Sequence, residues 1–238
     1  SSDGLPFFIV LQEVSFLKWK VNLIRQEAIP DGGQELTYIL GSQCKDGIVL
    51  VGDRKISGAE YPWEDKIFMD ISNFVVGSSG VYALFDKFRG RLLDFIASQA
   101  GQPLPIQKFL ETIENLTAEL NSKYSDRIGR SWFDVLVATR TNHGVFLQHV
   151  IKDGLAEPVK TYRVIGRGEP YGAVFLKTLW RPDMTMEQVA ELGYFIIKHI
   201  EQTELDDSVG VGEGHPQIWF IPKDAQKPIQ RAKPEFLE

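Results

Sequence analysis

The 238-residue chain has little of the chemistry that disulfides, metal sites and nucleic-acid interfaces require. Its one cysteine, Cys44, excludes an internal disulfide and indicates a reducing, cytoplasmic setting. Its four scattered histidines form no Cys/His cluster at zinc spacing, so we expect neither a metal nor an organic cofactor. With 26 Lys and Arg against 32 Asp and Glu, the net charge is −6. No run of basic residues is long enough to bind along a phosphate backbone, which argues against nucleic acid as a partner.

Long hydrophobic runs are also missing. The apolar run over residues 6–11 is too short to span a bilayer, no basic residues precede it, and no small-residue cleavage site follows it. We therefore expect no signal peptide and no membrane segment. A content of 43% hydrophobic and 24% charged residues is typical of a soluble globular protein, and the length fits one large domain.

The residue patterns alternate between groups of strands and groups of helices. Turn residues 45–47 between two β-prone runs predict a hairpin, and helical spacing of apolar residues predicts a pair of helices in the middle of the chain. Thr185 and Gln188 form a capping-box pattern at the start of a later helix. We predict strands over residues 7–11, 16–23, 37–44, 48–51, 66–71, 74–77, 132–139, 144–151, 160–165 and 217–221, and helices over 84–96, 106–120, 171–179 and 185–200. This order predicts an α+β fold with two sheets between helix layers.

Several motifs follow one another at characteristic separations. The clearest lie in residues 37–41, 45–55, 65–68 and 76–80, and weaker ones follow in 164–168, 185–200 and 205–210. In order and separation these motifs resemble those of the proteasome-type family of N-terminal nucleophile hydrolases. The resemblance implies a four-layer αββα sandwich over residues 37–238, preceded by an N-terminal extension or propeptide over residues 1–36. It also implies assembly into a ring with other copies or related subunits, and a polypeptide substrate.

The resemblance assigns roles to individual residues. In this family a threonine hydroxyl attacks the peptide bond, and the α-amino group of the same threonine, released by cleavage before it, acts as the base. By resemblance, the catalytic positions are Thr37 as nucleophile, Asp53 and Lys66 as the supporting ion pair, and Asp207 and Ser208 near the C-terminal end. The backbone N–H groups of Ser78, Ser79 and Gly80 are the candidates for the oxyanion hole.

The sequence departs from the family pattern at three positions. The two supporting serines of the family fall on Arg167 and Gly210, although Ser208 lies close enough to substitute for the second. Leu36 precedes Thr37, where the family usually carries a glycine at the cleavage point. Each site residue also has an ordinary structural interpretation: Thr37 as a strand threonine, Asp53 in a charged turn, and Lys66 on an edge strand.

Three functions therefore stay open. The first is a threonine peptidase that is activated by removal of residues 1–36. The second is a catalytically inactive subunit that serves ring assembly. The third possibility is another amidohydrolase or a peptide ligase of the same superfamily, because a fold does not fix the substrate.

Overall fold

In the part of the chain that the structure describes, two five-stranded antiparallel sheets form the centre. The computed structural model describes residues 37–55, 65–69, 74–99, 105–128, 133–203, 205, 209–212, 214–233 and 236. In spatial order, the first sheet consists of β10 (Gln230–Arg231), β9 (Gln217–Pro222), β2 (Gly47–Gly52), β1 (Ile39–Gln43) and β8 (Tyr162–Ile165). The second consists of β3 (Ile67–Met69), β4 (Phe74–Ser79), β5 (Asp134–Thr141), β6 (Gly144–Val150) and β7 (Ala156–Pro158). The strands predicted over residues 7–11 and 16–23 lie outside the described residues.

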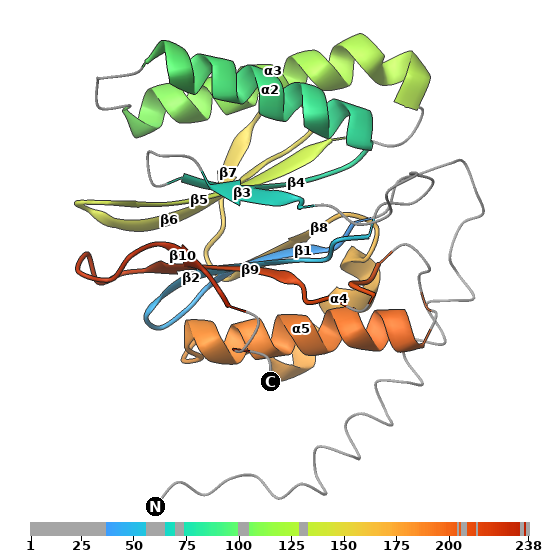
Figure 1. The fold of residues 1–238 in the computed structure, drawn as a ribbon, viewed down its shortest axis with the longest axis vertical. Helices are drawn as coiled ribbons and strands as arrows, with labels where there is room; N and C mark the ends of the chain where they lie inside the picture. The colour runs from blue at the N-terminus through green and yellow to red at the C-terminus, as the bar shows by residue number, and fades with distance from the viewer. Residues whose placement is uncertain are drawn as a thin grey trace, which may run out of the picture.

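Two pairs of helices cover the outer faces of the sheets (Figure 1). The first pair, on the second sheet, is α2 (Tyr82–Ser98) and α3 (Ile106–Ile128), and the second pair, on the first sheet, is α4 (Glu169–Leu179) and α5 (Met186–Gln202). Among the helices of the described part of the chain, none combines the length and hydropathy needed to cross a bilayer. The predicted four-layer αββα sandwich is confirmed.

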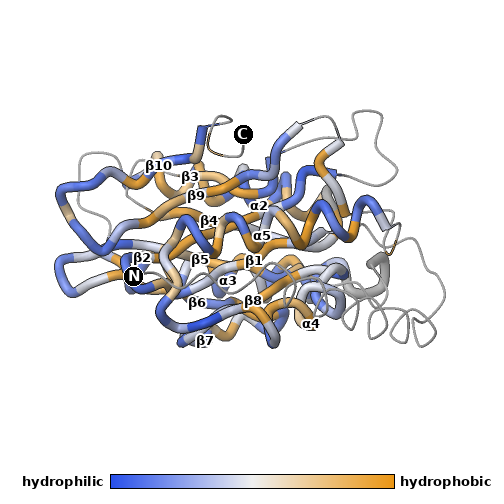
Figure 2. Tube along the Cα trace, turned by 90° about the horizontal axis from the view of Figure 1, so that it is seen from below, coloured by the Kyte–Doolittle hydropathy of each residue, from blue (hydrophilic) through white to orange (hydrophobic). Residues whose placement is uncertain are grey.

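The central strands of the first sheet, β1 and β2, are buried on both faces. In β2, Ile48 and Leu50 face the second sheet, whereas Val49 and Val51 face the layer of α4 and α5. Because successive side chains of a strand point to opposite faces, a doubly covered strand is apolar at every position. Figure 2 shows this pattern in the hydropathy of the chain: the central strands are hydrophobic and the hairpin ends are hydrophilic.

The N-terminus of α5 has the predicted capping box. The Thr185 side chain accepts a hydrogen bond from the Gln188 N–H at 3.3 Å, and the Gln188 side chain accepts one from the Thr185 N–H at 2.9 Å. The Asp46 carboxylate in the turn between β1 and β2 accepts a further bond from the Met186 N–H at 2.8 Å. These contacts fix α5 against the sheet that carries the candidate site.

Helix α4 packs so closely on Tyr38 that Gly172 has no room for a side chain. A Cβ at Gly172 would collide with the fully buried Tyr38 ring. We therefore expect Gly172→Ala to destabilise the protein by about 1–3 kcal/mol, the usual cost of an extra methyl group in a well-packed core. Urea unfolding measures this loss. Gly90→Ala is the matched control, because Gly90 is an exposed position of helix α2 and nothing lies within 4 Å of a Cβ there. Gly90→Ala should stabilise by about 0.5–1 kcal/mol; an equal loss in both variants would contradict this packing argument.

Candidate active site

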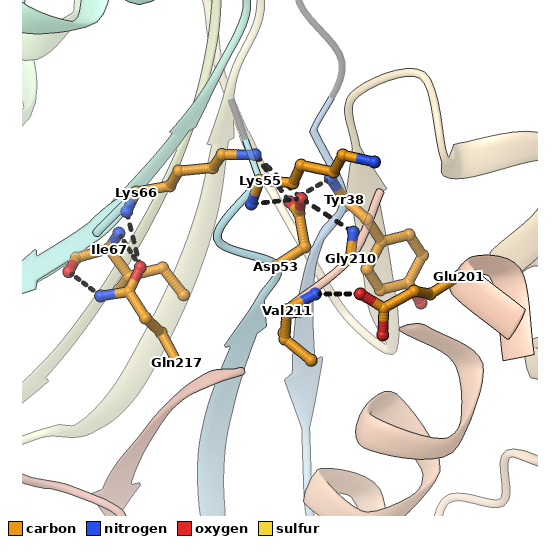
Figure 3. Close-up of polar contacts among 9 residues, drawn as sticks. All are labelled: Tyr38, Asp53, Lys55, Lys66, Ile67, Glu201, Gly210, Val211 and Gln217. Carbon is orange, nitrogen blue, oxygen red and sulfur yellow. Dashed lines mark hydrogen bonds and ion pairs between the residues drawn. The ribbon is translucent and has the colours of Figure 1, made fainter. Parts of the chain in front are cut away.

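Asp53 lies at the centre of the candidate site, one residue beyond the end of β2. Its side chain is fully buried and accepts hydrogen bonds from the backbone N–H groups of Tyr38 at 2.8 Å and Lys55 at 3.2 Å (Figure 3). The N–H of Gly210 makes a longer contact with the same carboxylate, at 3.5 Å. Backbone donors at both oxygens form a site that favours the ionised carboxylate.

Lys66 supplies the opposite charge from the residue before β3. Its Nζ lies 2.9 and 3.0 Å from the two oxygens of Asp53, and Lys66 is 6% exposed. Burial raises the pKa of the Asp53 carboxyl, while Lys66 and the Tyr38 and Gly210 N–H groups act in the opposite direction. The charged state of Asp53 therefore depends on its bond to Lys66.

Gln217 fixes the backbone of Lys66 from the opposite sheet. Its side-chain oxygen accepts hydrogen bonds from the N–H groups of Lys66 at 2.6 Å and Ile67 at 3.0 Å, and its side-chain nitrogen donates to the Ile67 carbonyl at 2.9 Å. Gln217 begins β9 and is fully buried. The Gln217 amide thus connects the start of β3, directly after Lys66, to the first sheet (Figure 3).

Thr37 lies two residues before the start of β1 and is 4% exposed. Its carbonyl accepts a hydrogen bond from the Gly168 N–H at 3.3 Å in the turn after β8. Gly166 in that turn has a φ of +97°, and a Cβ there would collide with the Thr37 carbonyl oxygen. Since the next residue, Tyr38, donates to Asp53, the chain places Thr37 beside the buried ion pair. Arg167 lies in the same turn and its side chain is exposed.

The predicted oxyanion segment lies at the end of β4, beside the start of β3. Ser78 donates its N–H to the Lys66 carbonyl at 3.2 Å, so this N–H group is already engaged. Ser79 is the last residue of β4, and Gly80 follows it with a φ of +122°. The structure therefore places this segment next to Lys66. The backbone N–H groups of Ser79 and Gly80 are the remaining candidates for the oxyanion hole.

The remaining candidate residues and the cysteine complete the description of the site. Asp207 and Ser208 lie outside the described residues. Cys44 is buried, and burial raises the pKa of its thiol to about 12, which makes it a structural side chain rather than a nucleophile. Among the described residues, no group of three or more His, Cys, Asp or Glu side chains is arranged to hold a metal ion.

Sequence reasoning missed Gln217 and Glu201, the two side chains that hold the backbone around the ion pair. Gln217 carries no signal in the sequence, because its partners lie about 150 residues away. Glu201 has a weak signal in the sequence. A carboxylate in the last turn of a helix interacts unfavourably with the helix dipole, so it needs another stabilising partner.

Comparisons with known proteins show the family of the chain. The family model "Proteasome subunit" matches residues 37–211, and the chain belongs to the proteasome subunit family. Proteasome subunit beta 2 from Pyrobaculum neutrophilum is 23% identical over 163 residues, which are 67% of this chain and 78% of that protein.

Two solved structures share the fold. Anbu (ancestral beta-subunit) from Yersinia bercovieri has a TM-score of 0.67 at 16% identity, over 84% of this chain and 90% of that chain. A Gly-1 mutant of Anbu from Hyphomicrobium sp. strain MC1 has a TM-score of 0.66 at the same identity and coverage. These likenesses confirm the predicted N-terminal nucleophile hydrolase fold.

Proposed function

We propose that the chain is an N-terminal threonine peptidase that becomes active when the Leu36–Thr37 bond is cut. The observation that carries this proposal is the buried Asp53–Lys66 ion pair directly beside the first strand that follows Thr37. A buried ion pair is expensive to maintain for stability alone, so its position beside a candidate nucleophile supports a chemical role.

The proposed reaction uses the free amino group of Thr37 as the base for its own hydroxyl. The Lys66 ammonium lowers the pKa of this amine, so that it is neutral and accepts the hydroxyl proton. The Thr37 oxygen attacks the peptide carbonyl, and the Ser79–Gly80 end of β4 donates to the resulting oxyanion. The peptide C–N bond breaks as the amine leaves with that proton, and water then hydrolyses the ester to restore Thr37.

The proposed setting is a ring built from copies of this chain or from related subunits, with peptides or unfolded polypeptides as substrate. A head-to-tail interface that closes on itself produces such a ring.

A second function, an inactive assembly subunit, is favoured by Gly210. This position matches a supporting serine in the family pattern, yet a Cβ at Gly210 would lie 2.5 Å from the Glu201 Oε1 atom. A serine there would therefore require the Glu201 side chain to move from its present position. Leu36 in place of the usual glycine before Thr37 points the same way.

Intact-protein mass spectrometry with N-terminal sequencing distinguishes these two functions. We expect a natively purified species that begins at Thr37 and hydrolyses fluorogenic peptides. Thr37→Ala should yield no such species and no hydrolysis, because the hydroxyl that attacks the peptide bond in both reactions is removed. Thr37→Ser is the matched control, since it keeps a hydroxyl and an amine at the same position.

A chain made to begin at Thr37 by cleavage of a removable leader tests hydrolysis independently of self-processing. If this chain folds and still hydrolyses no peptide, the inactive subunit is the correct interpretation.

A further inference from the structure

Glu201, in the last turn of α5, binds the loop that follows this helix. Its Oε1 atom accepts hydrogen bonds from the N–H groups of Val211 at 2.9 Å and Gly212 at 2.7 Å. Its Oε2 atom receives one from Lys198 at 2.9 Å, and Lys198 also donates to the Gly212 carbonyl at 3.1 Å. Two side chains of α5 thus hold both the N–H and the carbonyl of Gly212.

The loop then reaches the candidate site through Gly210. The Gly210 carbonyl accepts hydrogen bonds from the N–H groups of Arg54 at 3.1 Å and Lys55 at 3.2 Å, and the Gly210 N–H points at the Asp53 carboxylate. Figure 3 shows Glu201, Val211 and Gly210 in sequence between α5 and Asp53. A connected set of hydrogen bonds therefore runs from Glu201 to the ion pair.

The local geometry shows that Glu201 and this loop fit each other closely. Gly212 has a φ of +57°, a left-handed conformation suited to glycine. A Cβ at Gly210 would lie 2.5 Å from the Glu201 Oε1 atom, so a side chain there would displace Glu201 from its hydrogen bonds. Partial burial alone would raise the pKa of Glu201, but the bonds from Lys198, Gly212 and Val211 outweigh it and hold this pKa below its ordinary value. The helix dipole disfavours a carboxylate at this end of α5, and these donors compensate for it.

We infer that Glu201 is a positioning residue, which holds residues 210–212 against Asp53 and thereby sets the orientation of the Asp53–Lys66 pair. Only the kinetic part of this inference, the effect of Glu201 on peptide hydrolysis, rests on the proposed function. Its structural part, the coupling of α5 to the backbone of residues 53–55, stands independently of any activity.

The test compares Glu201→Ala and Glu201→Gln with Glu191→Gln, a control at an exposed glutamate on the same helix. Hydrogen exchange of the full-length chain reports on the backbone. We expect Glu201→Ala to speed exchange of the Val211 and Gly212 N–H groups and also of the Arg54 and Lys55 N–H groups. Glu201→Gln keeps one acceptor oxygen and should give a smaller change, and it also serves if the alanine variant folds poorly.

Kinetics of the species that begins at Thr37 provide the second measurement. We expect Glu201→Ala to lower kcat by about 10- to 100-fold, as small displacements of catalytic groups do. KM should change little, because Glu201 is placed to act on the ion pair rather than on substrate. The pH profile of kcat should shift, since the orientation of Lys66 determines the pKa of the Thr37 amine. The Gln variant should recover part of the rate, and Glu191→Gln should match the wild type.

The outcomes separate this inference from the proposed function. If the wild type hydrolyses nothing, the proposed function fails, and exchange of the Arg54 and Lys55 N–H groups alone decides the inference. Unchanged exchange at these two residues in Glu201→Ala overturns it. With an active wild type, faster exchange accompanied by an unchanged kcat and pH profile also overturns it, because Glu201 would then anchor a loop without positioning the site.

Discussion

Lys66→Met should abolish peptide hydrolysis and destabilise the protein by about 3–5 kcal/mol, the usual cost of breaking a buried ion pair. The substitution removes the cation from a site in which Asp53 is fully buried. The carboxylate then keeps its backbone donors but loses its charge partner, and its burial cost is no longer offset. Under the proposed function, the Thr37 amine also loses the cation that would keep it neutral. Urea unfolding of the full-length chain and kcat/KM of the species beginning at Thr37 measure the two effects.

The pair Arg91–Glu119 provides a control on the protein surface. This ion pair joins α2 and α3 with a shortest distance of 2.8 Å, and both side chains are nearly half exposed. Arg91→Met should cost far less stability than Lys66→Met, because solvent screens exposed charges. Combining Asp53→Asn with Lys66→Met should cost less than the sum of the two single changes, since the double variant leaves no unpaired charge. Equal losses of stability for Lys66→Met and Arg91→Met would contradict the claim that burial makes the Asp53–Lys66 pair costly to break.

The sequence predicted the elements whose patterns are local. The hairpin of β1 and β2, the α2 and α3 pair and the capping box of α5 all follow from residue spacing within one element, and all three are confirmed. Short edge strands were missed. Strand β7 spans Ala156–Pro158 and β10 spans Gln230–Arg231, and neither is long enough to show an alternating pattern.

The candidate site was predictable to the extent that the family resemblance covers it. Asp53 and Lys66 were named from motifs, and the structure places them in direct contact. The contacts of Gln217 join segments about 150 residues apart, which a single sequence does not show. Those of Glu201 depend on the path of the loop after α5, of which its position in the last helical turn is only a weak sign. Gln217 in particular begins an otherwise apolar strand, where local pattern alone predicts a solvent-facing end.

Gln217→Leu tests whether that buried amide holds Lys66 in place. The substitution leaves the N–H groups of Lys66 and Ile67 and the carbonyl of Ile67 without their side-chain partner. Each buried polar group left unpaired costs about 1–3 kcal/mol, so we expect a loss of about 3 kcal/mol or more in urea unfolding. Lys66 should also move relative to Asp53, which lowers kcat more than it raises KM.

Gln43→Leu is the matched control for this effect. Gln43 ends β1 far from Thr37, and its half-buried side chain donates one hydrogen bond, to the Val159 carbonyl at 3.3 Å. Because one long, partly exposed bond contributes little, Gln43→Leu should cost well under the loss seen for Gln217→Leu and should leave kcat unchanged. If both variants lose the same stability, the two sheets hold the start of β3 without the Gln217 amide. If Gln217→Leu is unstable yet keeps its kcat, Asp53 alone orients Lys66, and the two effects of the substitution have separate causes.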